Sequence, residues 1–231
     1  MINLTQIETN IKRLSWWQKA AVTIDNHHSN KSGVMLTHHL ESVYQNVEAI
    51  FQQPATGFYG KLFALLPILK LDKEALKNEL KIVALLHDIG KTAEDKTLII
   101  PHPLTGKPAH KRHGLVSLIA AMEILGNDLV KWPKRRDCIY HAIELHDISY
   151  GLFREYNSTG DIPQNEQWDH INHKIHAVPA AGILYLLIFK LADIHGHASI
   201  NDVLWFFTTA KDNYFNQLNI DLPIPTEGDI R

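Results

Sequence analysis

The segment "LKIVALLHDIGK" (residues 80–91) indicates the fold class, because a helical pattern of apolar residues runs through it. Leu80, Val83 and Ala84 fall on one face of a helix. The pattern extends over residues 72–89, and the aspartate at its first position is a favoured N-cap. This segment therefore predicts an amphipathic helix with one buried face.

Similar helical patterns fill most of the rest of the chain. They cover residues 34–51, 112–125, 133–146, 179–194 and 201–215. The segment 179–194 is apolar almost all round, which predicts a position at the centre of a bundle. No segment alternates with period two, so strands are expected to be incidental. We expect an all-α fold, a helical bundle of roughly seven to nine helices that forms a single domain over residues 1–231.

Two longer segments lack the helical pattern and are rich in Gly, Pro, Asn and Asp. They are residues 92–111 and residues 149–174. We expect both to be loops, and loops of this length often act as lids over a site.

Composition limits the classes of partner. The net charge is −2, which leaves no basic face, so long nucleic acid is not expected to bind. The single cysteine, Cys138, excludes an intramolecular disulfide and a multi-cysteine zinc site. The chain starts without an apolar signal core, and its longest apolar run is too short to span a bilayer. We therefore expect a cytoplasmic protein with no membrane association.

The chain contains 15 histidines, and their positions matter more than their number. One histidine on an apolar face is most simply a hydrogen-bonded core residue. Five inward faces, however, carry a histidine or an aspartate near one end: His39, His87 with Asp88, His113, His146 and Asp193. An isolated buried carboxylate is costly, and a divalent cation relieves that cost. The coincidence therefore predicts one buried metal site.

The order of these residues resembles the HD-domain superfamily of metal-dependent phosphohydrolases. The motifs that carry the resemblance are "LLHDIGK", "RHGLVSLIA" and "KLAD", and the likeness covers residues 33–197. The phrase "HHSNKSGVMLTHHLE" (residues 27–41) is also similar to the opening of HD domains in conjugative-relaxase-associated proteins and certain exoribonucleases. That alignment selects His38 as the first ligand, whereas the helical stripe selects His39. We prefer His39 and keep His38 as an alternative; His110 is likewise an alternative to His113.

The resemblance implies two ions that share one carboxylate. His39, His87, Asp88 and Asp193 would hold the first ion, and Asp88 would join His113 and His146 in holding the second. One or two divalent transition metal ions are expected. Mixed imidazole and carboxylate ligands suit Mn, Fe, Co, Ni or Zn, whereas Mg prefers more oxygen ligands. Asp147 stands where many dinuclear members of the superfamily carry a further histidine, which departs from the pattern.

The implied activity is hydrolysis of a phosphomonoester or phosphodiester in a small phosphorylated molecule, such as a nucleotide. Metal-bound hydroxide would be the nucleophile, and Asp88 the shared carboxylate. Lys91 would contact the substrate phosphate or orient Asp88; a lysine favoured by the helix dipole explains it equally well. Two alternatives remain open. One is a di-iron oxygenase with the same ligands, and the other is a non-catalytic regulatory or interaction domain that keeps a metal for stability.

Further polar residues flank the ligands in sequence. Candidates for a phosphate clamp are Lys107, Lys111 and Arg112; candidates for a general acid are Glu94 and Asp95; candidates for orienting substrate are His195 and His197. A solvent-exposed loop residue is the simpler interpretation of each one alone.

Overall fold

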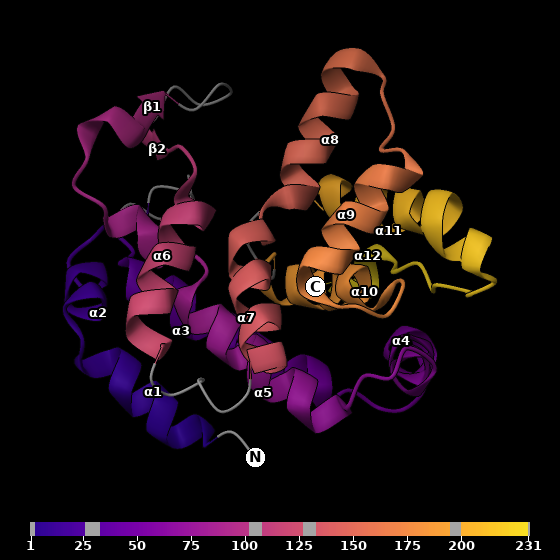
Figure 1. Cartoon of the computed structure of the whole chain (residues 1–231), viewed down its shortest axis with the longest axis horizontal. Coiled ribbons are helices and arrows are strands. Elements are labelled where there is room, and N and C mark those ends of the chain that lie inside the picture. The colour runs from indigo at the N-terminus through magenta and orange to yellow at the C-terminus, as the bar shows by residue number, and fades with distance from the viewer. Residues whose placement is uncertain (1–2, 26–32, 102–107, 127–132, 195–199, 231) are drawn as a thin grey trace.

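The structure is a computed structural model that describes residues 3–25, 33–101, 108–126, 133–194 and 200–230 (Figure 1). The all-α prediction is confirmed. The α-helices are α1 (Leu4–Arg13), α2 (Ser15–Ala20), α3 (Leu36–Phe51), α4 (Gly57–Ile68), α5 (Lys73–Leu86), α6 (His113–Leu125), α7 (Pro133–Leu145), α8 (Ile148–Thr159), α9 (Asn165–Ile175), α10 (Ala181–Asp193), α11 (Asn201–Ala210) and α12 (Glu227–Ile230). Shorter helical turns are η1 (Ile89–Thr92), η2 (Lys96–Leu98), η3 (Lys211–Phe215, a π-helix) and η4 (Asn216–Leu218).

The expectation that residues 149–174 form a loop is wrong, because α8 and most of α9 lie there. Polar residues dominate α9, yet Trp168, Ile171 and Ile175 are buried at helical spacing. A capping box at Gln164 also marks its start. With α1, α2 and α4 also present, the α-helices run to α12, beyond the seven to nine expected.

The expected loop at residues 92–111 contains the only β-structure in the described part of the chain apart from one isolated bridge. Strand β1 (Ile99–Pro101) pairs antiparallel with β2 (Pro108–His110), with Ile99 opposite His110. This short hairpin lies beyond one end of α6 (Figure 1). Two three-residue strands agree with the expectation that strands are incidental.

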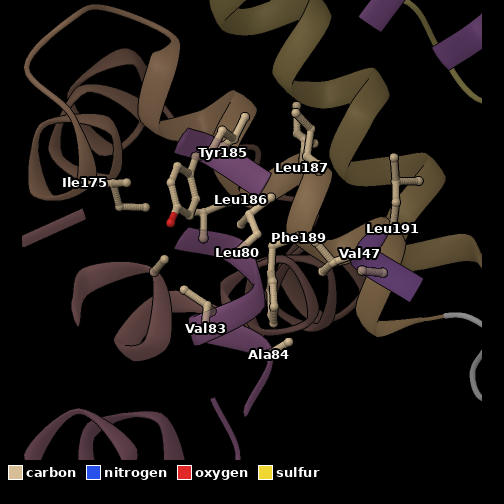
Figure 2. Packing of buried hydrophobic residues seen from close by; sticks show 14 of the residues in the cluster. Val47, Leu80, Val83, Ala84, Ile175, Tyr185, Leu186, Leu187, Phe189 and Leu191 are labelled. Atoms are coloured by element: carbon tan, nitrogen blue, oxygen red, sulfur yellow. The ribbon is translucent and has the colours of Figure 1, made fainter. Parts of the chain in front are cut away.

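Helix α10 lies at the centre of the bundle, as its apolar sequence predicts. Every residue from Ala181 to Ala192 is buried, and α10 packs on α3, α5, α7, α9 and α11. Leu80, Val83 and Ala84 of α5 lie against it (Figure 2). The Phe189 ring of α10 meets the His87 imidazole edge-on, with centroids 5.3 Å apart. The apolar core therefore extends directly to the first predicted ligands.

The helices around the site cross at short distances that glycines permit. A Cβ atom on Gly114 of α6 would lie 2.6 Å from the Glu144 carbonyl oxygen of α7. A Cβ atom on Gly182 of α10 would lie 2.4 Å from the Asn172 carbonyl oxygen of α9. These approaches bring the backbones of α6 and α7, and of α9 and α10, closer than a larger residue would allow.

No helix among the residues that the structure describes combines the length and the apolar character needed to cross a membrane.

A buried carboxylate on α5 makes stability depend on pH. Burial raises the pKa of Glu79 to about 7, although Arg135 lies 3.1 Å from its Oε1. In the unfolded chain this glutamate loses its proton near pH 4.5, whereas in the folded protein it keeps the proton until about pH 7. The free energy of unfolding therefore falls as pH rises from about 4.5 to 7, by on the order of 3 kcal/mol. Glu79→Gln should remove this slope in urea unfolding measured from pH 5 to 8. An unchanged slope in the variant would contradict the assignment to Glu79.

Candidate metal centre

Helix α5 ends one turn earlier than its sequence pattern predicts, and this early end sets the direction of the His87 and Asp88 side chains. The α-helix stops at Leu86, with His87 as its C-cap. Asp88 then adopts φ −108° and ψ 2°, and the chain continues into the 3₁₀ turn η1. His87 is fully buried and Asp88 is 3% exposed. The change of backbone direction lets both adjacent side chains face the same interior point, which a straight helix would not do.

The first group of ligand atoms consists of His39, His87 and Asp88. The two imidazole Nε2 atoms lie 3.1 Å apart. Asp88 Oδ2 lies 3.4 Å from Nε2 of His39 and 3.5 Å from Nε2 of His87. Asp193, at the end of α10, borders this group, with Oδ1 3.5 and 3.3 Å from the same two nitrogens. Four residues from α3, α10 and the end of α5 thus surround one point.

The second group consists of Asp88, His113 and His146. The other carboxylate oxygen of Asp88, Oδ1, lies 3.2 Å from His113 Nε2 and 3.3 Å from His146 Nε2. Those two nitrogens are 3.1 Å apart. Asp88 therefore offers one oxygen to each group and joins the two.

Backbone carbonyls select the neutral tautomer of three of the histidines. The Nδ1–H groups of His87, His113 and His146 donate to carbonyl oxygens three residues earlier, at 3.0, 3.1 and 2.8 Å. A carbonyl only accepts, so each neutral ring carries its proton on Nδ1 and points a lone pair on Nε2 into the site. This arrangement is typical of metal-binding histidines.

The resulting crowding of lone pairs fits a bound cation. The Nε2 atoms of His113 and His146 face each other at 3.1 Å, and both are acceptors in the neutral rings. Asp88 Oδ1 is buried beside them, and within the described residues no N–H group donates to it. Acceptors gathered in this way repel one another unless a proton or a cation lies among them. The two groups therefore fit one or two metal ions that share Asp88.

Two buried lysines balance part of the charge. Lys91 Nζ lies 2.5 Å from Asp88 Oδ2, and Lys190 Nζ lies 3.7 Å from Asp193 Oδ2. Burial opposes ionisation of Asp88, but the Lys91 ammonium outweighs it and holds the pKa of Asp88 well below the usual range. Burial likewise opposes ionisation of Asp193, but its pKa lies well below the usual range, and the nearby Lys190 ammonium favours the charged carboxylate. Both carboxylates are therefore anionic at neutral pH, as metal ligands must be.

The glycine of the HDIG motif sets the distance between the two groups. A Cβ atom on Gly90 would lie 2.5 Å from the His113 carbonyl oxygen and 2.6 Å from the Ser117 nitrogen. The Gly90 N–H donates to Ser117 Oγ at 2.9 Å. The turn after Asp88 thus docks directly onto the first turn of α6, which brings His113 to the shared carboxylate.

The alternative ligands lie elsewhere. His38 is exposed, whereas His39 is buried, in agreement with the helical stripe of α3. His110 is in neither group within the described residues; its carbonyl instead receives the Nδ1–H of His113. Lys91, a candidate for phosphate contact, is buried against Asp88, which favours the role of orienting that carboxylate.

The flanking candidates that the structure describes are not gathered at the site. Glu94 pairs with Lys19 of α2 at 2.9 Å, and Asp95 caps η2 through Thr97. Lys111 and Arg112 are exposed. Lys107, His195 and His197 lie outside the described residues. Arg112 precedes His113 with φ +58°, a left-handed conformation that is uncommon for a residue with a side chain.

Sequence reasoning missed three residues around the ligands. Asp25 lies outside the motif region, is 2% exposed, and reaches Lys91 with Oδ1 3.6 Å from Nζ. Asp202 of α11 reaches Lys190 at 3.5 Å. Asn46 of α3 donates to the Ala192 carbonyl at 2.9 Å and holds the end of α10 beside Asp193. Of these three residues, only Asn46 could have been found from the sequence. It lies on the same face of α3 as Val43 and His39, at helical spacings of three and four.

Metal binding should stabilise the fold. Adding Mn²⁺ or Co²⁺ at about 100 times Kd to chelator-treated protein is expected to stabilise it by about 2.7 kcal/mol per ion, or roughly 5–10 °C in Tm. The measurement is differential scanning fluorimetry across a metal series, with Ca²⁺ as a control for ligands that prefer oxygen. No shift with any transition metal would contradict the assignment of these residues as a metal centre.

Comparison of the chain with protein-family models, with curated proteins and with solved structures finds no match. The chemistry of the site is therefore inferred from its own geometry: two buried groups of imidazole and carboxylate ligands, joined by Asp88, that can hold metal ions.

Proposed function

We propose that this protein is a metal-dependent phosphohydrolase that acts on a phosphomonoester or phosphodiester of a small molecule, with a nucleotide as the first candidate. The observation that carries the proposal is the position of Asp88, which offers Oδ2 to one group and Oδ1 to the other. The resemblance of the HDIGK and KLAD motifs to the HD-domain superfamily supports the same reaction class.

Metal ions held by these ligands would activate water and neutralise the charge that develops on phosphoryl oxygens. The residues of the chain make three contributions. Asp88 and Asp193 supply anionic oxygens, and in three histidines the backbone hydrogen bond at Nδ1 leaves the Nε2 lone pair of the neutral ring directed into the site. The apolar wall formed by Phe189 and its neighbours excludes water from the inner side.

The degree of burial indicates from which side a substrate approaches. The side chains of His87 and His146 are 0% and 2% exposed, whereas that of His113 is 12% exposed. Asp147 lies next to His113, with Oδ2 3.8 Å from Nε2, and its side chain is 35% exposed. Asp193, which borders the first group, is also 13% exposed, so it is the partly exposed Asp147 that makes the second group the more open side. We propose that the phosphoryl group enters here, between His113 and Asp147.

The test is hydrolysis by full-length protein, prepared metal-free and then reconstituted separately with Mn²⁺, Fe²⁺, Co²⁺ and Zn²⁺. A panel of nucleoside monophosphates, cyclic nucleotides and simple phosphomonoesters and phosphodiesters would be assayed for released phosphate or nucleoside. We expect turnover that chelation abolishes and metal restores. His146→Ala should remove one ion and leave the other, and should reduce turnover by about a hundredfold or more.

The alternatives predict different results. Bound metal with no turnover of any phosphorylated compound would favour a non-catalytic domain stabilised by metal. Turnover that needs O₂ and stops under strict anaerobiosis would favour a di-iron oxygenase. Either result would overturn the proposed hydrolysis while leaving the metal centre intact.

A further inference from the structure

Asp88 in the first group and Asp193 beside it each have a buried lysine three residues away in sequence. Lys91 follows Asp88 by three residues, and Lys190 precedes Asp193 by three. Both lysines are buried, with side chains 10% exposed. A buried ammonium beside a ligand carboxylate competes with a cation for that carboxylate's charge.

A second carboxylate, from an outer segment of the chain, faces each lysine. Asp25 follows Ile24, which bridges to Met35, and the Asp25 N–H donates to the Val34 carbonyl at 2.9 Å. These contacts fix Asp25 in front of α3, with Oδ1 3.6 Å from Lys91 Nζ. The side chain of Asp25 is fully buried.

Asp202 makes the corresponding contact on the other side of the site. It lies in the first turn of α11, is 5% exposed, and places Oδ2 3.5 Å from Lys190 Nζ. Helix α11 packs on α10, which carries Lys190, so the pair joins two helices. The pattern of carboxylate, lysine and ligand carboxylate therefore occurs twice, in segments that are distant in sequence.

We infer that Asp25 and Asp202 are positioning residues that share the charge of Lys91 and Lys190, and so keep Asp88 and Asp193 available to metal. Each lysine orients its ligand carboxylate, and the outer aspartate prevents the ammonium from neutralising it. Without the outer aspartate, the lysine pairs with the ligand alone, and affinity for a cation falls. This inference rests on the metal centre that the proposed function requires, but it does not depend on hydrolysis.

The two positioning residues should act on different ions. Asp88 belongs to both groups, so Asp25→Asn should weaken both ions. Asp193 borders only the first group, so Asp202→Asn should weaken one ion and leave the other near its wild-type affinity. A general loss of stability would not produce this difference between the variants.

The experiment is a titration of metal-free, full-length protein with Co²⁺. Binding is measured by calorimetry and by the visible absorption of the bound ion. Removing the negative charge of either outer aspartate should raise the apparent Kd for Co²⁺ by about tenfold. We expect this increase for both binding steps in Asp25→Asn and for one step in Asp202→Asn. Asp25→Glu, which keeps the carboxylate, should recover most of the affinity.

A matched control is available on α3 and α5. Glu48 pairs with buried Lys81, so Glu48→Gln also removes the carboxylate from a buried lysine, but this pair contacts no ligand. Glu48→Gln should lower Tm without changing Co²⁺ affinity. The inference would be overturned if Kd stayed within twofold of wild type in both Asp25→Asn and Asp202→Asn. It would also be overturned if the two variants raised Kd equally for both binding steps. Altered affinity in protein that hydrolyses nothing would support the inference while contradicting the proposed function.

Discussion

Asp88→Asn is expected to remove both metal ions and to lower phosphohydrolase activity by about a thousandfold or more. The asparagine keeps the volume of the side chain but loses the negative charge that both groups share. Its amide nitrogen also places a donor where a cation needs an acceptor. Metal content per chain by inductively coupled plasma mass spectrometry and initial rates on the best substrate are the two measurements.

The same substitution at Asp95 is the control for Asp88→Asn. Asp95 lies seven residues later and is exposed, and within the described residues its side chain hydrogen-bonds only to Thr97, in its own turn. Asp95→Asn should keep two ions and wild-type rates. Retention of both ions in Asp88→Asn, with the variant folded by circular dichroism, would show that Asp88 is not the shared ligand.

Gly90→Ala is expected to separate the two groups and to remove the second ion while the first remains. The added Cβ meets the backbone of α6 at 2.5 and 2.6 Å, so α6 must move away from η1. His113 moves with it, whereas His39 and His87 stay on α3 and at the end of α5. Overpacking at a backbone contact costs about 1–3 kcal/mol. Unfolding in urea and metal content per chain measure the two effects.

Gly151→Ala is the matched control for this prediction. Gly151 lies inside α8, and a Cβ atom there meets nothing within 4 Å. Replacing it with alanine should stabilise the helix by up to about 1 kcal/mol, because alanine has the higher helix propensity. Two bound ions in Gly90→Ala, at wild-type stability, would contradict the role given to Gly90.

The all-α fold, the central place of α10 and the preference for His39 over His38 could all be predicted from the order of residues along the chain. Each of these follows from local periodicity, because the face that a helix buries is set by residues three and four apart. The same reasoning failed at residues 149–174, where polar residues hide the apolar stripe of α9. It also failed at Asp88, because α5 ends before this residue and the backbone dihedral angles of Asp88 are no longer those of an α-helix.

The packing of the helices, by contrast, is needed to see which oxygen of Asp88 faces which group, and which outer residues contact the lysines. Asp25 and Asp202 carry no periodic signal, because their partners Lys91 and Lys190 lie on other segments of the chain. The close contact of Gly90 with α6 is equally invisible along the chain, because it joins two backbones rather than two side chains. Helical periodicity reports which side of a helix is buried. The distances between ligands depend on how the helices pack against one another, and that packing determines whether a metal ion can be held.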